Sequence, residues 1–163
     1  MIYLPRQGQR NHHAQMPSTH LSLHYHLVFS TKDRVGTISP IWRPRLHAFL
    51  GGVVNQLEGV PEKIGGVSDH VHLLIGLKAT HRLADVLREI KSVSSRWVHE
   101  EIGLQPFSWQ EGYGAFTVSS TQLGAVSDYI TRQEEHHRTQ SFQDEYREFL
   151  ERAAVKYDER FLW

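Results

Sequence analysis

The sequence predicts an α+β fold in which one four-stranded antiparallel sheet carries helices on one face and is followed by C-terminal helices. Three observations support this prediction. The length of 163 residues suits a single domain. The β-prone and helical stretches follow the order strand, helix, strand, strand, helix, strand, helix, helix, without an internal repeat. The first six elements match the split βαβ arrangement of ferredoxin-like (RRM-like) folds.

Between residues 21 and 77 the pattern predicts three strands and one helix. Residues 21–30 alternate between apolar and mainly polar side chains, which is typical of a strand. Residues 44–58 carry apolar side chains at helical spacing and predict a helix. Residues 60–67 and 70–77 are short β-prone runs joined by two residues, which indicates a hairpin or a bulged continuation.

The rest of the chain predicts three helices and the fourth strand. Residues 81–102 form an amphipathic pattern whose polar side is basic and rich in hydroxyl groups. Aromatic and β-branched residues predict a strand at 113–118. A serine at 119 or 120 can cap a helix over 121–137, and a last amphipathic helix is predicted at 143–157.

Composition excludes several classes of protein. Hydrophobic residues make up 39% and charged residues 22%, which is an ordinary globular composition. The absence of cysteine excludes disulfides, thiolate zinc sites and cysteine nucleophiles. No apolar run approaches the roughly 18 to 20 residues that cross a bilayer, and the polar start lacks the apolar stretch of a secretion signal. We therefore expect a cytoplasmic protein without membrane contact, whose residues 1–17 form a flexible tail.

Charge is distributed unevenly along the chain. Eighteen Lys and Arg balance eighteen Asp and Glu, so composition alone does not indicate a nucleic-acid binder. Residues 1–96, however, hold twelve basic and six acidic side chains, and residues 97–163 hold six basic and twelve acidic ones. We expect a basic surface near His70 and His72, with acidic residues elsewhere.

His70 and His72 are the first candidate site. Side chains two apart on a strand point the same way, with Cα atoms about 6.6 Å apart, so these two imidazoles can share one metal ion. A pair of surface or hydrogen-bonded histidines is the alternative interpretation. His24 and His26 on the first strand can line the same site or satisfy polar partners.

Tyr129 and Gln133 are the second candidate, because residues four apart on a helix are neighbours. A phenol oxygen can attack phosphorus while an amide oxygen, together with imidazoles, holds a cation. A core tyrosine is the alternative. Glu134, His136 and His137 follow as alternative metal ligands or as a local acid and base.

Four segments, taken in chain order, resemble the HUH-type single-tyrosine transposases of insertion-sequence-200-like elements and their repeat-associated relatives. These segments are HYHLVFSTKDR, GGVSDHVHLLIGL, IKSVSSRW and FSWQEGYGAFTVSSTQLGAVSDYITRQEEHH. The resemblance covers about residues 18–145, which would form the catalytic domain, with 146–163 as a helical extension. The ending YDERFLW is similar to that of the solitary, domesticated branch.

The resemblance implies a role for each candidate. His70 and His72 would be metal ligands, Gln133 the third protein ligand, and Tyr129 a nucleophile that forms a 5′-phosphotyrosine link with single-stranded DNA. The cation would be Mg²⁺ or Mn²⁺, and the protein a nucleoid-associated homodimer whose sites can be completed in trans. A DNA hairpin would be bound by basic and hydroxyl side chains: Lys32, Arg34, Arg43, Arg45, Arg88, Lys91, Ser92, Ser95 and Arg96.

Two other functions remain open from the sequence. A domesticated protein can bind hairpins or repeats with reduced or no cleavage. A histidine-dependent zinc hydrolase is the third interpretation, although no positioned carboxylate base is evident from the sequence. The solvated face of a charged helix is also an alternative explanation for the basic residues at 88–96.

Overall fold

The computed structural model describes residues 20–162, so the predicted tail at 1–17 lies outside the described residues. The main elements in chain order are β1 (His24–Ser30), α1 (Arg43–Gln56), β2 (Val60–Gly66), β3 (His70–Gly76), α2 (Leu83–Trp97), β4 (Gly114–Val118), α3 (Leu123–Thr131), α4 (Gln133–His136) and α5 (Phe142–Arg152). Short 3-10 turns follow β1, β4 and α5, and a π-helical turn (Val98–Ile102) extends α2.

The four strands form one antiparallel sheet with the order β2-β3-β1-β4. β1 and β3 are the central strands, and Val28 lies opposite His72 in their ladder. The β2–β3 hairpin has a register shift between Pro61 and Lys63. These pairings confirm the predicted ferredoxin-like α+β fold.

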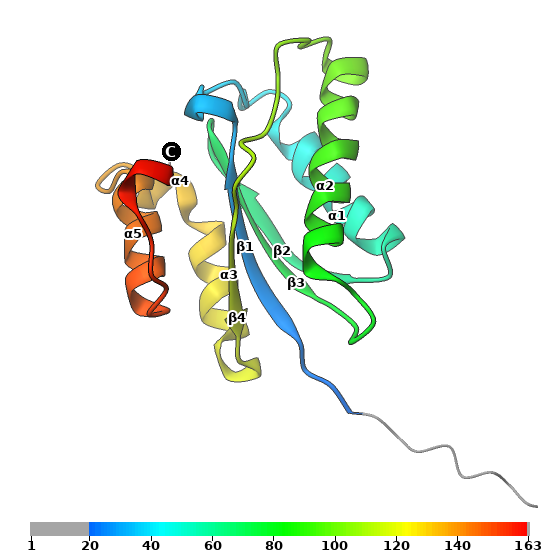
Figure 1. Ribbon diagram of the computed structural model, residues 1–163. Coiled ribbons are helices and arrows are strands. Elements are labelled where there is room, and N and C mark those ends of the chain that lie inside the picture. The colour runs from blue at the N-terminus through cyan, green and yellow to red at the C-terminus, as the bar shows by residue number, and fades with distance from the viewer. Residues whose placement is uncertain (1–19, 163) are drawn as a thin grey trace, which may run out of the picture.

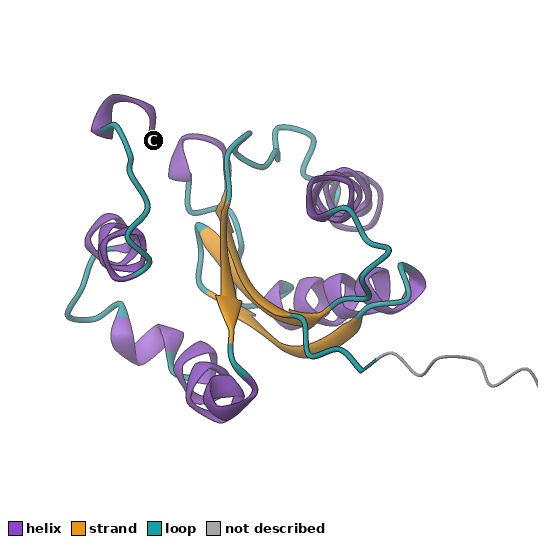
Figure 2. Ribbon diagram, turned by 60° about the horizontal axis from the view of Figure 1, so that its bottom comes forward, coloured by secondary structure: helices purple, strands orange, loops and turns teal. Residues whose placement is uncertain are grey.

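Helices cover both faces of the sheet (Figure 1). α1 and α2 lie on one side, and α3, α4 and α5 lie on the other, as Figure 2 shows with the sheet seen between them. The C-terminal helices thus cover the face opposite the two long helices. Among the described residues, no helix has both the length and the apolar character needed to cross a membrane.

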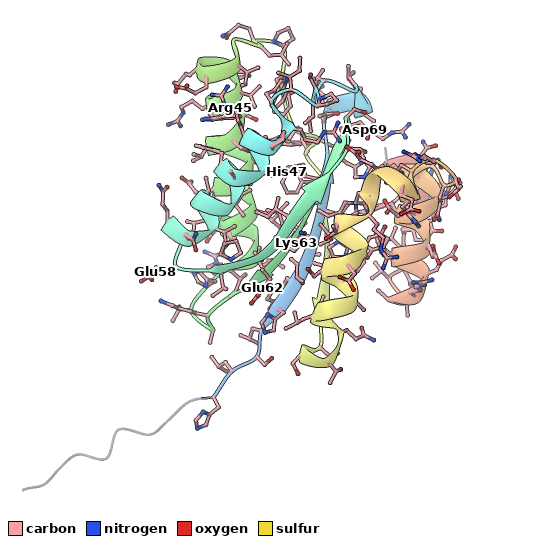
Figure 3. The ribbon with its side chains drawn as sticks, turned by 180° about the vertical axis from the view of Figure 1, so that it is seen from behind. Arg45, His47, Glu58, Glu62, Lys63 and Asp69 are labelled. Carbon is pink, nitrogen blue, oxygen red and sulfur yellow. The ribbon has the colours of Figure 1, made fainter. Side chains whose placement is uncertain are left out.

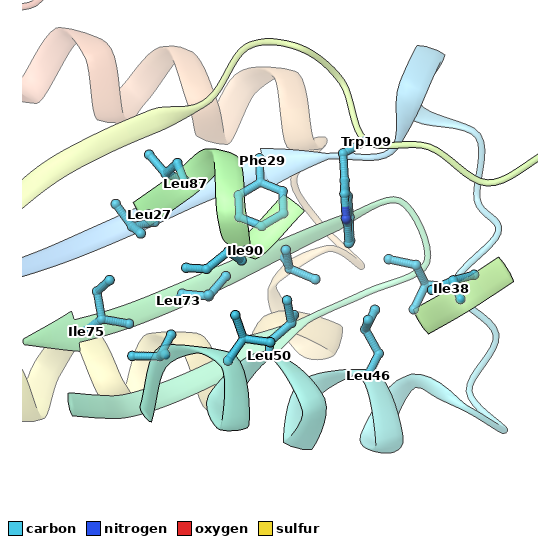
Figure 4. Packing of buried hydrophobic residues seen from close by; sticks show 14 of the residues in the cluster. Leu27, Phe29, Ile38, Leu46, Leu50, Leu73, Ile75, Leu87, Ile90 and Trp109 are labelled. Atoms are coloured by element: carbon cyan, nitrogen blue, oxygen red, sulfur yellow. The ribbon is translucent and has the colours of Figure 1, made fainter. Parts of the chain in front are cut away.

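The main hydrophobic core lies between the sheet and the α1/α2 layer (Figure 4). Alternate side chains of the central strands, including Leu27, Phe29 and Leu73, point into this layer and are at most 2% exposed. Leu50 of α1 and Ile90 of α2 meet them from the helices. This face provides most of the buried apolar surface, and burial of such surface is the dominant favourable term in folding.

The helix predicted over 121–137 is not continuous, and that prediction is wrong. α3 ends at Thr131, Arg132 has φ −96° and ψ 19°, and α4 begins at Gln133. The break lets the Gln133 side chain enter the interior, where it bonds to side chains of other elements. Tertiary hydrogen bonds therefore override the helical spacing that the sequence suggests.

The last helix is shorter than predicted, since α5 spans Phe142–Arg152. Ser141 caps it by accepting a hydrogen bond from the backbone N–H of Asp144 at 3.2 Å. The expected boundary between residues 145 and 146 lies within α5.

Candidate functional site

His70 and His72 lie on the sheet face that α3, α4 and α5 cover, and both are fully buried. His70 Nδ1 donates to Asp69 Oδ1 at 2.8 Å, and Figure 3 labels Asp69 at the start of β3. His72 Nδ1 lies 2.9 Å from His26 Nε2 of β1. With both Nδ1 atoms engaged, the two Nε2 atoms are left to face the C-terminal helices.

Three side chains, from α4, from the residue that follows α4 and from α5, converge on these Nε2 atoms. Gln133 Oε1 lies 3.3 Å from His70 Nε2 and 3.0 Å from His137 Nε2. Glu145 Oε2 lies 3.6 Å from His72 Nε2 and 3.3 Å from His137 Nε2. Gln133 Nε2 also donates to Glu145 Oε1 at 3.1 Å, which ties α4 to α5. We call these five residues the ligand cluster.

The ligand cluster fits a metal ion. The donor atoms of His70, His72, His137 and Glu145 lie within 4.8 Å of one another. Ligands about 2.1 Å from a common ion lie about 3 to 4.2 Å from each other, so little movement is needed. Within residues 20–162, the buried His72 Nε2 and Glu145 Oε2 have no hydrogen-bond partner, and a cation would satisfy both.

The protonation of His72 and His137 suits a cation, whereas Glu145 must lose a proton before it can bind one. Burial, followed by repulsion from Asp69 and Glu148, raises the pKa of Glu145 to about 8. Burial, followed by the charge of His70, holds the pKa of His72 well below its ordinary value and lowers that of His137. The imidazoles of His72 and His137 are therefore neutral, and neutral imidazole is the form that binds metals.

Tyr129 of α3 lies beside the ligand cluster. Its ring centroid is 5.9 Å from that of His72 and 5.2 Å from that of His136. Its hydroxyl is buried and has no hydrogen-bond partner among the described residues. A cavity of about 550 Å³ adjoins Tyr129, between α3 and α5. The tyrosine and the ligand cluster lie beside each other within one chain.

Gly65 explains how α3 comes so close to the sheet. A Cβ atom at this position would lie 2.6 Å from the carbonyl oxygen of Ile130, the residue after Tyr129. Glycine is thus required for the close approach of the α3 backbone to β2. In the ladder, Gly65 lies opposite His72, which brings the tyrosine helix over the metal-binding strand.

The predicted alternatives Glu134, His136 and His137 have three different environments. His137 joins the ligand cluster. His136 packs against Tyr129 and lies outside the cluster, with its Nε2 3.8 Å from Glu145 Oε1. Glu134 points away and forms an ion pair of 2.6 Å with Arg43, which also bonds weakly to the Gly66 carbonyl at 3.5 Å.

Arg43 and Glu134 thus join the start of α1 to α4. Arg43 is 8% exposed, so its guanidinium is engaged within the protein. Next to this pair, a groove of about 280 Å³ runs along the outer strand β2. It is lined by His47 of α1 and Lys63 of β2, both labelled in Figure 3.

The basic face of α2 lies on the opposite side of the sheet from the ligand cluster (Figure 1). Lys91 Nζ donates to the carbonyls of Gln110, Glu111 and Gly112 at 2.5, 2.9 and 2.8 Å, so it holds the loop before β4. Arg88, Ser92 and Arg96 are exposed and Ser95 is half-buried.

The remaining predicted DNA contacts lie in two different parts of the structure. Lys32 is exposed and Arg34 half-buried, and both lie in the turn after β1. Ser30, at the end of β1, pairs with His70, so this turn is at the same end of the sheet as the ligand cluster. Arg45 of α1 is exposed and lies over the Trp97 ring at 5.5 Å.

The expected basic surface beside His70 and His72 is wrong. The surroundings carry both signs, because Asp69, Glu145 and Glu148 are acidic while Arg43 and Arg152 are basic. The reason is that α5, which belongs to the acidic half of the sequence, folds over this face. The charge gradient along the chain therefore does not become a charge gradient around the site.

Sequence reasoning missed Glu145 and the supporting role of Asp69. One signal for Glu145 exists, because it lies on the apolar stripe of α5 between Phe142 and Phe149. A carboxylate on such a stripe is almost never buried without a partner. Asp69 directly precedes His70, but only the structure shows its contact with Nδ1.

Two solved structures share the fold. One is a candidate transposase from Deinococcus radiodurans R1, with a TM-score of 0.57 and 24% identity over 72% of this chain and 95% of that one. The other is a REP-associated tyrosine transposase bound to a REP hairpin, with a TM-score of 0.55 and 15% identity over 75% of this chain and 74% of that one. A search of curated proteins gave no match.

The family comparison covers most of the described chain. Residues 19–133 match the family described as "Transposase IS200 like". The matched segment includes His70, His72, Tyr129 and Gln133, whereas His137 and Glu145 follow it. With most of its length matched and its fold shared, the chain belongs to the IS200-like transposases, a family of DNA-processing enzymes.

Proposed function

We propose that the protein is a metal-dependent transposase that nicks and rejoins single-stranded, hairpin-bearing DNA through a covalent 5′-phosphotyrosine at Tyr129. The observation that carries this proposal is the placement of the Tyr129 ring 5.9 Å from that of His72, beside five converging ligand side chains. A phenol next to a candidate cation site has the two components that phosphodiester transfer requires.

The reaction exchanges one phosphodiester bond for another. The Tyr129 oxygen bonds to phosphorus while the bond from phosphorus to the 3′ oxygen breaks, and that oxygen leaves as a 3′-hydroxyl after gaining a proton. A 3′-hydroxyl then attacks the phosphotyrosine and releases Tyr129. Since each step forms the bond type that it breaks, neither water nor ATP is consumed.

The chain supplies positioning and proton transfer. α3 holds Tyr129 against the ligand cluster, and His136 is the imidazole that we assign to accept the phenol proton, because the two rings pack 5.2 Å apart. This step requires assistance, since a tyrosine with a pKa of about 10 stays protonated at neutral pH.

His70, His72 and Gln133 would hold the cation, with His137 and Glu145 completing its shell. When bound, the ion neutralises charge on a non-bridging phosphate oxygen. Imidazole ligands favour Mn²⁺ over Mg²⁺, because Mg²⁺ prefers oxygen, and the Glu145 carboxylate suits both. The same imidazoles also suit Zn²⁺, so metal analysis of the purified protein is the direct check of the ion.

A DNA hairpin is the proposed partner. Support comes from the REP-associated neighbour, which was solved bound to a hairpin. Lys32 and Arg34, in the turn at the His70 end of β1, are proposed contacts close to the site, whereas exposed Arg45, Arg88 and Arg96 lie on the α1/α2 side of the sheet and would contact more distant parts of the DNA. Homodimerisation, with sites that can be completed in trans, also stays a prediction.

The test uses a 3′-labelled single strand that carries the inverted repeat flanking the gene, with MnCl₂ or with EDTA. The wild-type protein is expected to form a labelled adduct that survives denaturation, in Mn²⁺ only. Tyr129→Phe should form none, while Tyr113→Phe, which changes an exposed tyrosine, should match the wild type. Adduct of unchanged yield in Tyr129→Phe would overturn the assignment.

A hairpin-binding protein with little or no cleavage is the second candidate function. The observation that favours it is the burial of the Tyr129 hydroxyl. In this case the protein slows the migration of the labelled hairpin in a native gel, and neither adduct nor cut strand forms in Mn²⁺.

A further inference from the structure

His26 and His72 form a buried pair that links the ligand cluster to the central strand β1. His26 Nε2 lies 2.9 Å from His72 Nδ1, and the two rings are stacked with centroids 5.1 Å apart and an angle of 25° between them. His26 is 4% exposed and His72 is fully buried. The hydrogen bond between the two rings is thus buried, and His26 also lines the cavity beside Tyr129.

The geometry fixes which nitrogen carries each proton. His72 can bind a metal through Nε2 only if that atom keeps its lone pair, and a neutral imidazole then carries its proton on Nδ1. His72 Nδ1–H therefore donates to His26 Nε2. His26 in turn must be the tautomer with its own proton on Nδ1.

The two metal-binding histidines are oriented by different groups. His70 donates to the Asp69 carboxylate, which is the usual partner of a metal-bound histidine. His72 has a neutral imidazole in that place. Outer partners of this kind set ring orientation and tautomer, and their loss weakens metal binding.

We propose that His26 is a positioning residue that fixes the tautomer and orientation of His72 and so sets the metal affinity of the ligand cluster. The inference rests on the proposed metal site but not on DNA cleavage. His26 also packs against Tyr129 with ring centroids 6.2 Å apart, and against Phe149 at 5.2 Å. It is thereby held between the metal-binding strand, the tyrosine helix and α5.

The experiment measures Mn²⁺ binding by calorimetry on metal-free full-length protein. His26→Phe keeps an aromatic ring and removes the acceptor, so the dissociation constant should rise by about 10- to 100-fold. His26→Gln places an amide oxygen at the position of Nε2, and affinity should return to within a few-fold of wild type. His24→Phe is the control, because His24 lies on the same face of β1 and outside the ligand cluster.

A second measurement reads the tautomer directly. Nitrogen-15 NMR of the histidine-labelled wild type, loaded with Zn²⁺ as a diamagnetic probe, should show His72 protonated on Nδ1 and His26 protonated on Nδ1. This spectrum decides the question even when His26→Phe does not fold.

Three results would overturn the inference. These are wild-type Mn²⁺ affinity in folded His26→Phe, a proton on Nε2 of His72 in the Zn²⁺ complex, and no recovery in His26→Gln. A protein that passes these tests and forms no DNA adduct would refute the proposed cleavage alone.

Discussion

The two faces of the sheet share one backbone but carry different kinds of side chain. Among the described residues, the α1/α2 face buries seventeen hydrophobic residues in one cluster, whereas the cluster on the α3–α5 face has three, Leu74, Val118 and Ile130. In place of further apolar side chains, the second face carries the histidines and the buried Gln133 and Glu145. The first face thus stabilises the fold, and the second face is available for chemistry.

This division has a simple physical origin. Alternation along β3 sends Val71, Leu73 and Ile75 to one side and His70 and His72 to the other. His72 is therefore flanked in the chain by two core residues, Val71 and Leu73, and His70 by Val71 on one side. A rigid strand is a better support for a metal site than a loop.

Leu73→Ala gives the largest expected change in stability. Leu73 is fully buried in the α1/α2 core, so the free energy of unfolding should fall by about 2 to 5 kcal/mol. Urea denaturation measures this change. Mn²⁺ affinity under folding conditions should stay within a few-fold of wild type, whereas His72→Ala should lose binding. Equal loss of Mn²⁺ binding in both variants would mean that the two faces are not separable.

Gly65→Ala should disrupt the second face selectively. The new Cβ would lie 2.6 Å from the Ile130 carbonyl oxygen, so α3 must shift and carry Tyr129 away from His72. A displacement of about 1 Å can cost about 100-fold in rate, and adduct formation should fall by that order.

Gly52→Ala is the matched control for this change. Nothing lies within 4 Å of a Cβ at Gly52, which is exposed on α1. Alanine there should raise stability by up to about 1 kcal/mol and leave the adduct unchanged. An unaltered adduct yield in Gly65→Ala would show that α3 tolerates displacement.

His47→Leu tests the boundary between the two faces and has the smallest expected effect. Burial, followed by repulsion from Arg43, lowers the pKa of His47 to about 4 from 6.5. The unfolded chain therefore binds a proton more readily between these values, and stability that is full above about pH 6.5 is lost as pH falls toward 4.

Removing His47 should reduce that acid sensitivity without abolishing it. His26 has the same direction of pKa shift and stays in place. The drop in unfolding free energy from pH 7 to pH 5 should be about 1 kcal/mol smaller in His47→Leu. Identical pH profiles for the two proteins would show that the groove at β2 stays hydrated when His47 is charged.

The sequence predicted the features that depend on local periodicity. Alternation in 21–30 and 70–77 was enough to locate β1 and β3 and to place His70 and His72 on one face. It was not enough to place Glu145, which lies on a separate helix and reaches His72 only after α5 folds over the sheet. The Arg43–Glu134 pair, 91 residues apart in the chain, could not be predicted from local periodicity either.

The sequence by itself determined the order of elements, the two-faced character of β3 and the residue types available for phosphodiester chemistry. The tertiary structure alone decided that the helix breaks at Arg132, that His137 and Glu145 join Gln133 at the histidines, and that acidic α5 covers them. The physical reason is the separation along the chain over which each interaction acts. Strand and helix periodicity act between near neighbours in the chain, whereas burial of a polar cluster is favourable only when all its partners arrive together from distant segments.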